Sequence, residues 1–163
     1  MAGGAILSDC KRYRWRLERQ IGAGEITVAV FGVNPSTADA DLDDHTVRKW
    51  RGFGQRLAWG RLIVGNVFSF RATDVTRLAT EPDPFGADHR DHQARIVADA
   101  DLLVPCWGNR HKVPRSLHPE FDALLRLLHA TGKPVMCWGT TSSGDPKHPL
   151  TLGYHTELVA LPH

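Results

Sequence analysis

The sequence has 163 residues, of which 42% are hydrophobic and 23% are charged, and its formal net charge is +2 at pH 7. This length fits one globular domain, and this composition excludes an intrinsically disordered chain. No run of about 18 apolar residues is present, and three cysteines without a CxxC pair do not fit a closed disulfide framework. We therefore expect a single cytoplasmic domain over residues 1–163 that has no contact with a membrane.

The first predicted element is an edge strand or hairpin arm within Ser8–Leu17. Tyr13, Trp15 and Leu17 alternate there with arginines, and a period of two is typical of a strand with one buried face. The pattern predicts that these apolar side chains pack on the core and that the arginines form a solvated outer face.

Four short apolar runs follow the N-terminal segment, and each is followed by Gly, Asn or another polar residue. Such runs are typical of strands that are covered on both faces. They are Ile26–Val33, Arg61–Phe70, Asp101–Trp107 and Pro134–Trp138.

Three segments between these runs repeat their apolar residues at helical spacing. They are Thr46–Trp59, Asp88–Ala100 and Pro119–Thr131. Alternation of strands and helices is typical of a parallel sheet between two helical layers. We therefore predict a three-layer α/β/α sandwich with a central four-stranded, mainly parallel sheet, to which the N-terminal strand or hairpin is added.

Polar residues follow every predicted strand. In an open α/β sheet, ligands bind beyond the carboxyl ends of the strands, where loops and helix N-termini converge. The candidates in these loops are Asn34 and Ser36, then Asn66, then Asn109 and Arg110, and finally Lys147 and His148. We expect these loops to surround one cavity, suited to a base or a nucleotide.

The motifs at these positions resemble two groups of proteins. One group is a bacterial and phage domain family of unknown function, which the chain resembles in four motifs. In chain order these are SDCKRYRWRL, NPSTADADLDDHT, NVFSFRAT and DPKHPL. The other group, which the chain resembles more distantly, is the uracil-DNA glycosylase superfamily. The motifs that carry this resemblance are VNPST, GNVFSF, LLVPCWGNR and KHPL. It implies a uracil-DNA glycosylase-like fold.

The second resemblance implies roles for three residues. Asn34 matches the residue that positions a water molecule, and Asn66 matches the residue that reads the base. His148 matches the residue of a late His-Pro loop that stabilises the departing base or grips phosphate. The resemblance implies a hydrolase that cleaves the N-glycosidic bond of a base, including a modified one, in DNA or in a nucleotide.

Other side chains have the chemistry that such a reaction needs. Asp43 or Asp44 can act as a general base or stabilise an oxocarbenium-like sugar, although Asp44 also has the position of a helix N-cap. A neutral or protonated His148 can donate a hydrogen bond to a carbonyl oxygen of the base. The remaining candidates for base binding are Phe31, Ser36 and Phe68. For both phenylalanines the alternative is packing in the core. The candidates for contact with phosphate or nucleic acid are Arg71, Asn109, Arg110 and Lys147.

Two further functions stay open at the level of sequence. One is a nucleic-acid or nucleotide binding module without catalysis, because a fold does not fix a function. The other is a metal-dependent phosphoesterase. Its metal ligands would be aspartates that can hold Mg²⁺, namely Asp39, Asp41, Asp43 and Asp44. A separate set that could bind zinc is Cys106, His111, Cys137 and His148. Neither set has a recognised metal-ligand spacing, so we expect no metal. We expect no other cofactor either. The expected partner is DNA or a nucleotide.

Overall fold

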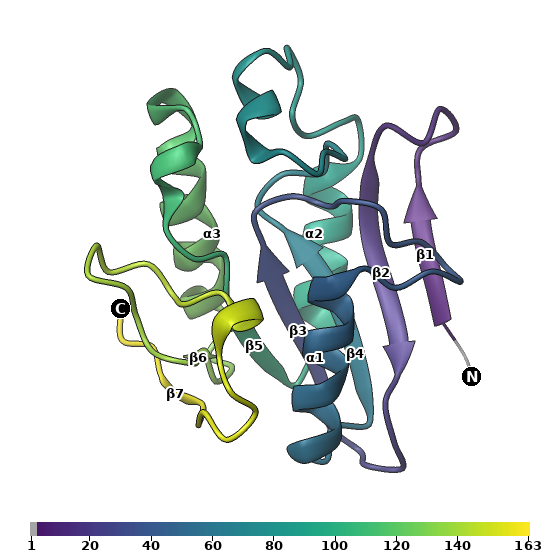
Figure 1. The fold of residues 1–163 in the computed structure, drawn as a ribbon, viewed down its shortest axis with the longest axis vertical. Helices are drawn as coiled ribbons and strands as arrows, with labels where there is room; N and C mark the ends of the chain where they lie inside the picture. Colours follow the sequence, from purple (N-terminus) through teal and green to yellow (C-terminus); the bar gives the residue numbers. More distant parts are fainter. Residues whose placement is uncertain (1–2) are drawn as a thin grey trace.

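The computed structural model describes residues 3–163 and has an α/β fold built on a mixed sheet (Figure 1). The first two residues of the predicted domain, 1–163, lie outside the described part. Within residues 3–163 the main sheet has five strands in the order β1-β2-β4-β3-β5. Their bounds are Gly3–Leu7 (β1), Arg14–Gln20 (β2), Thr27–Gly32 (β3), Arg61–Asn66 (β4) and Leu102–Pro105 (β5).

The sheet differs from the predicted four-stranded, mainly parallel one. β3 pairs in parallel with β4 and β5, whereas β2 pairs antiparallel with both β1 and β4. The fourth apolar run meets the sheet only through a bridge between Leu103 and Val135. Within the same run, the two residues after Val135 form β6 (Met136–Cys137), which pairs antiparallel with β7 (Val159–Ala160). Pro134 has no backbone N–H and cannot extend the ladder towards its start, so the run is too short to form a full fourth parallel strand.

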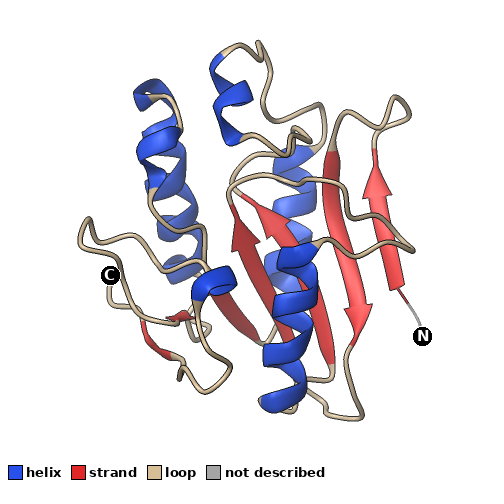
Figure 2. Cartoon of the chain, viewed as in Figure 1, coloured by secondary structure: helices blue, strands red, loops and turns tan. Residues whose placement is uncertain are grey.

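Three α-helices cover the two faces of the sheet within residues 3–163 (Figure 2). They are α1 (His45–Arg56), α2 (His89–Asp99) and α3 (His118–Ala130), each within a few residues of its predicted range. Short 3-10 helices occur in the loops: η1 (Val75–Ala79), η2 (Arg110–Lys112), η3 (Arg115–Leu117) and η4 (Pro149–Thr151). In the described part of the chain, no helix has the length and apolarity needed to cross a membrane.

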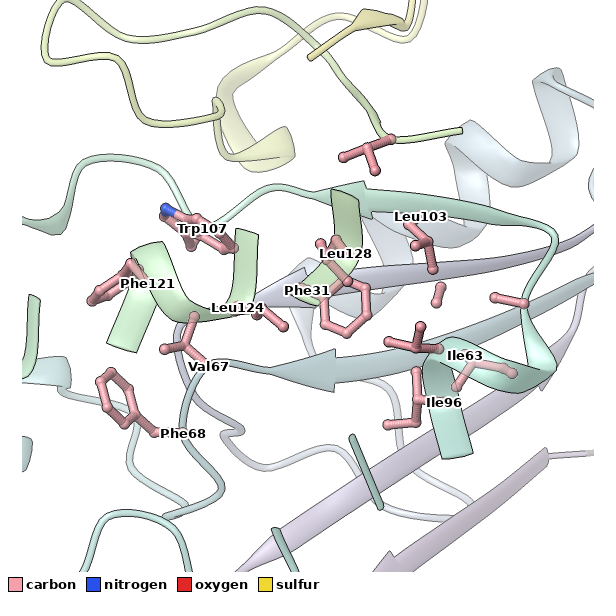
Figure 3. Packing of buried hydrophobic residues seen from close by; sticks show 14 of the residues in the cluster. Phe31, Ile63, Val67, Phe68, Ile96, Leu103, Trp107, Phe121, Leu124 and Leu128 are labelled. Carbon is pink, nitrogen blue, oxygen red and sulfur yellow. The ribbon is translucent and has the colours of Figure 1, made fainter. Parts of the chain in front are cut away.

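The core is divided by the sheet into two clusters, one on each of its faces. One cluster joins Phe31 and Ile63 of the sheet to Ile96 of α2 and to Phe121 and Leu124 of α3 (Figure 3). The other joins Val30 and Val64 to Trp50 and Phe53 of α1, and Trp138 completes it. Successive residues of a strand point to opposite faces, so β3 supplies both clusters.

The prediction that the N-terminal arginines form a solvated outer face is wrong for Arg14 and Arg16, which are both buried. Arg16 is buried because α2 covers its face of the sheet, where it binds Asp99 (2.8 Å), whereas Arg14 is buried because of a bulge in β2. Ile6 pairs with Arg16 and Leu7 pairs with Arg14, so Trp15 is an extra residue in the ladder. Trp15 stacks on His92 of α2, and a bulge shifts the alternation of the side chains on either side of it.

Candidate functional site

A cavity of about 470 Å³ lies at the carboxyl ends of the parallel strands. Its volume is in the usual range for a small-molecule site. The cavity is lined by Asn66, within the second apolar run, and by Asn34, Asn109 and His148, which follow the other three runs. The structure therefore places the predicted strand-end residues around one shared space.

Asn34 is held by its amide nitrogen. Nδ2 donates to the carbonyl oxygens of Pro35 (3.2 Å), Phe70 (3.0 Å) and Ala72 (3.0 Å). Three acceptors around one nitrogen fix the orientation of the amide, because its oxygen would be repelled there. Within residues 3–163, Oδ1 of Asn34 has no hydrogen-bond partner, so it is free to accept a hydrogen bond from a ligand or water in the cavity.

Asn66 is the last residue of β4 and is buried at the cavity. Its backbone oxygen accepts from Gln93 (3.5 Å), but its side-chain amide has no partner among the residues that the structure describes. A Cβ atom on Gly32 would lie 3.0 Å from Oδ1 of Asn66. A glycine at this position therefore leaves room for an amide that can both donate and accept.

His148 and Asp44 are two of the titratable groups that line the cavity. Nδ1 of His148 accepts from the backbone N–H of Leu150 (3.2 Å), so the proton of the neutral ring is on Nε2. Burial lowers the pKa of His148, while the charge of Asp44 acts in the opposite direction. Oδ1 of Asp44 accepts from the N–H of Val47 (2.9 Å), so Asp44 is the N-cap of α1 and lines the cavity as well.

Ser36 and Asn109 add polar side chains to the lining of the cavity. The Ser36 hydroxyl is 3.1 Å from that of Thr73, and both residues line the cavity. Oδ1 of Asn109 caps η2 by accepting from the N–H of His111 (3.2 Å), which leaves its Nδ2 as a donor. Asn109 is exposed, so its amide is accessible from solvent.

Three predicted site residues lie away from the cavity. Phe31 and Phe68 are 0% exposed and pack in the core beside α2 and α3 (Figure 3), so neither face is open to a base. Asp43 binds Arg19 (2.8 Å) and Arg51 (2.7 Å) instead of facing the cavity. Burial raises the pKa of Asp43, but hydrogen bonds from Arg19 and Arg51 outweigh it and hold the pKa below its ordinary value.

The three cations predicted to contact phosphate also lie outside the cavity lining. Arg71 donates to backbone oxygens, including that of Ser36 (2.9 Å), and so supports the loop after β3. Arg110 is paired with Asp145 (2.9 Å) and Asp122 (3.1 Å). Lys147 is exposed at the loop beside Gly139. These positions indicate structural contacts for the two arginines.

The lining residues that sequence reasoning missed include Arg14, Trp50 and Lys112. Trp50 belongs to the apolar stripe of α1, and from the sequence an indole in such a stripe is predicted only to pack in the core. Lys112 is one exposed cation among many. Arg14 is 3% exposed, and the alternating pattern placed it on the solvent side because a bulge leaves no mark in the sequence.

The candidate metal ligands do not come together. Among the residues that the structure describes, no three side chains of His, Cys, Asp or Glu form a group that could hold a metal ion. Asp39 accepts from the N–H groups of Asp41 and Leu42, while Asp43 and Asp44 have the separate partners given above. The arrangement gives the phosphoesterase alternative no support.

Comparison with known proteins finds one family. The model of a family described as "Protein of unknown function (DUF1643)" matches residues 14–150. No curated protein and no solved structure matches the chain.

Proposed function

The chain belongs to the DUF1643 family of proteins of unknown function, and we propose that it is a hydrolase that cleaves the N-glycosidic bond between a base and its sugar in DNA or a nucleotide. The observation that carries the proposal is the shared cavity, where Asn34, Asn66 and His148 each keep an unused hydrogen-bonding group. Asn34 keeps an acceptor oxygen, Asn66 keeps a whole amide that can donate and accept, and His148 keeps a ring N–H donor. The distant resemblance to uracil-DNA glycosylases supports the same reaction.

The reaction requires a water molecule, a reader of the base and a donor for the leaving group. Oδ1 of Asn34 accepts from the water, whose oxygen bonds to C1′ of the sugar as the bond from C1′ to the base nitrogen breaks. The electron pair leaves with the base, and Nε2–H of His148 stabilises the charge that grows on a base carbonyl oxygen. Asp44 takes the proton of the water with its second carboxylate oxygen.

Asn66 reads the base in this proposal. A side-chain amide can face a base edge with one donor and one acceptor, and such a bidentate pair discriminates between bases by about 1–3 kcal/mol. A base within duplex DNA would have to leave the helix to reach Asn66, whereas a free nucleotide or a single strand would not. Arg71 and Arg110 are no longer part of the proposed site, because both are engaged within the protein.

Release of free base tests the proposal. The substrates are uracil-containing and modified-base-containing oligonucleotides, single- and double-stranded, together with nucleoside monophosphates, and chromatography with mass detection measures the product. We expect Asn34→Ala and His148→Ala to lower turnover by about 10² or more, as when one preorganised group is lost. His111→Ala is the matched control, because His111 is exposed and does not line the cavity.

The result that contradicts this proposal is binding without release. If bases or nucleotides bind the wild-type protein and no substrate of the panel yields free base, the protein is a binding module. If turnover is normal in His148→Ala, His148 has no part in the reaction.

A further inference from the structure

Arg14 is a buried cation in the cavity wall without a carboxylate partner. Its side chain is 3% exposed, and Nη1 donates to the backbone oxygen of Ala38 (3.0 Å). Nε is buried without any hydrogen-bond partner, and within residues 3–163 Nη2 has none either. No Asp or Glu oxygen of that part of the chain lies within 4.0 Å of the guanidinium, so its charge is not neutralised by direct contact. A buried charge of this kind is costly unless something pairs with it.

The bulge of β2 turns this arginine towards the cavity. Leu17, on the C-terminal side of the bulge, packs in the cluster beside α1. Arg16 points to the opposite face, where it binds Asp99 of α2 (2.8 Å). With Trp15 as the extra residue, Arg14 returns to the face of α1 and lines the cavity. Bulges are frequent beside functional sites because they re-aim one side chain in this way.

The N-terminus of α1 meets the same cavity. His45 and Thr46 line it, and within the described residues their backbone N–H groups have no hydrogen-bond partner. Free N–H groups and the dipole of a twelve-residue helix favour an anion at this end. The hydroxyls of Ser36 and Thr37 add donors in the same lining.

The charges around Arg14 are mixed. Asp44 and Asp39 attract its guanidinium from beyond ion-pair distance, and Arg71 and Arg19 repel it. Of the residues that line the cavity, Arg14 and Lys112 are cations and Asp44 is the carboxylate, so the formal charge is 2 − 1 = +1 with both histidines neutral. The cavity can therefore accept one anionic group next to a neutral base.

We propose that Arg14 and the N-terminus of α1 form a phosphate subsite, so that the ligand of the cavity is a phosphorylated nucleotide unit rather than a free nucleoside. Nη2, which has no hydrogen-bond partner within residues 3–163, can donate a charge-assisted hydrogen bond to an oxygen of a phosphate. This inference rests on the proposed function for the identity of the base, but the phosphate contact can be measured independently of catalysis.

Calorimetric titration tests the subsite. The probes are inorganic phosphate, the four deoxynucleosides and their 5′-monophosphates, and a short DNA strand without terminal phosphates. For the wild-type protein we expect at least one monophosphate to bind about tenfold or more tightly than its nucleoside, as charge-assisted hydrogen bonds provide. The DNA strand separates the two sources of phosphate: tight binding of it points to a backbone phosphodiester, and weak binding to the terminal group of a nucleotide.

Variants connect that preference to Arg14. Arg14→Met is expected to remove the preference for the monophosphate, and Arg14→Lys to restore part of it. Arg12→Met is the matched control, because Arg12 is an exposed arginine paired with Glu81 (2.7 Å) outside the cavity. Circular dichroism and thermal unfolding verify that each variant is folded; if Arg14→Met is not, the comparison of Arg14→Lys with the wild type decides.

The outcomes separate the two proposals. Equal affinity of the wild-type protein for nucleosides and monophosphates overturns the phosphate subsite, even if the protein releases bases. An unchanged preference in Arg14→Met, or in Arg14→Lys if the former does not fold, overturns the role of Arg14. Preference for the monophosphate without any base release supports the subsite and contradicts the hydrolase.

Discussion

Asn34 and Asn66 both line the cavity, but their side-chain amides form different hydrogen bonds within the protein. Asn34 uses its amide nitrogen to hold the loop around Phe70 and Ala72, and its oxygen remains for the ligand. Asn66 has no side-chain partner in the described part of the chain and is available as a whole. Under the proposed function, Asn34 would serve both stability and binding, whereas Asn66 would serve binding alone.

Alanine substitutions separate these two roles. We expect Asn34→Ala to lower the free energy of unfolding by about 2 kcal/mol, because backbone carbonyls lose their donor. Asn66→Ala should change it by no more than about 0.5 kcal/mol, because no hydrogen bond within the protein is lost. Urea unfolding at pH 7 measures both, and each variant is the control for the other. Equal losses in the two variants would mean that Asn66 has a structural partner.

At the scale of elements, α2 begins with a buried histidine. Nδ1 of His89 lies 2.6 Å from the Ser69 hydroxyl after β4, and Nε2 lies 3.4 Å from Nε2 of Gln93. Burial, with a smaller contribution from the charge of Arg90, lowers the pKa of His89 from 6.5 to about 4. A cation at this end of a helix is also unfavourable because of the helix dipole.

This histidine makes the docking of α2 sensitive to acid. Below pH 6.5 the unfolded chain takes up a proton that the folded protein binds only near pH 4, so stability falls as the pH decreases through this window. We expect a loss of about 2 kcal/mol between pH 7 and pH 5 from His89 alone. Urea unfolding at both pH values should show a smaller loss for His89→Gln. An identical loss in that variant would assign the effect to the other histidines.

At the scale of the whole molecule, Asp43 connects three parts of the chain. Its carboxylate joins Arg19 of β2 to Arg51 of α1, and Arg19 also donates to the backbone oxygens of Asp39 and Leu42. The acidic loop between β3 and α1 is thereby held against the N-terminal hairpin. The aspartate predicted to be catalytic is therefore part of the scaffold.

Substitution of Asp43 tests this assignment. Asp43→Asn should lower the free energy of unfolding by about 2–3 kcal/mol, because the nearly buried Arg19 loses its counter-ion. The pKa of Asp43 is lowered, so its contribution is complete above the unfolded value near 4 and is lost as the pH falls through the folded one. Base release per folded molecule should equal that of the wild type. A hundredfold loss of release in a fully folded variant would return Asp43 to the mechanism.

Much of this arrangement could be predicted from the sequence. Helical spacing and capping residues are local signals, so the three helices were found, and the carboxyl ends of parallel strands meet at one edge, so the cavity around Asn34, Asn66, Asn109 and His148 could be expected. Long-range features could not. The partners of Asp43 lie 24 and 8 residues away, and a continuous apolar run does not tell which face Phe31 or Phe68 takes.

The cavity draws its lining from nearly the whole length of the chain, from Arg14 in the second strand to Leu150 in the last 3-10 helix. These two residues are also the first and last positions of the family match. No fragment ending before residue 148 has all its walls, and local unfolding of either terminal region opens the space. We therefore expect an occupant that contacts both Arg14 and His148 to bind the folded chain better than a state in which either region is displaced, so that by mass action its binding stabilises both regions.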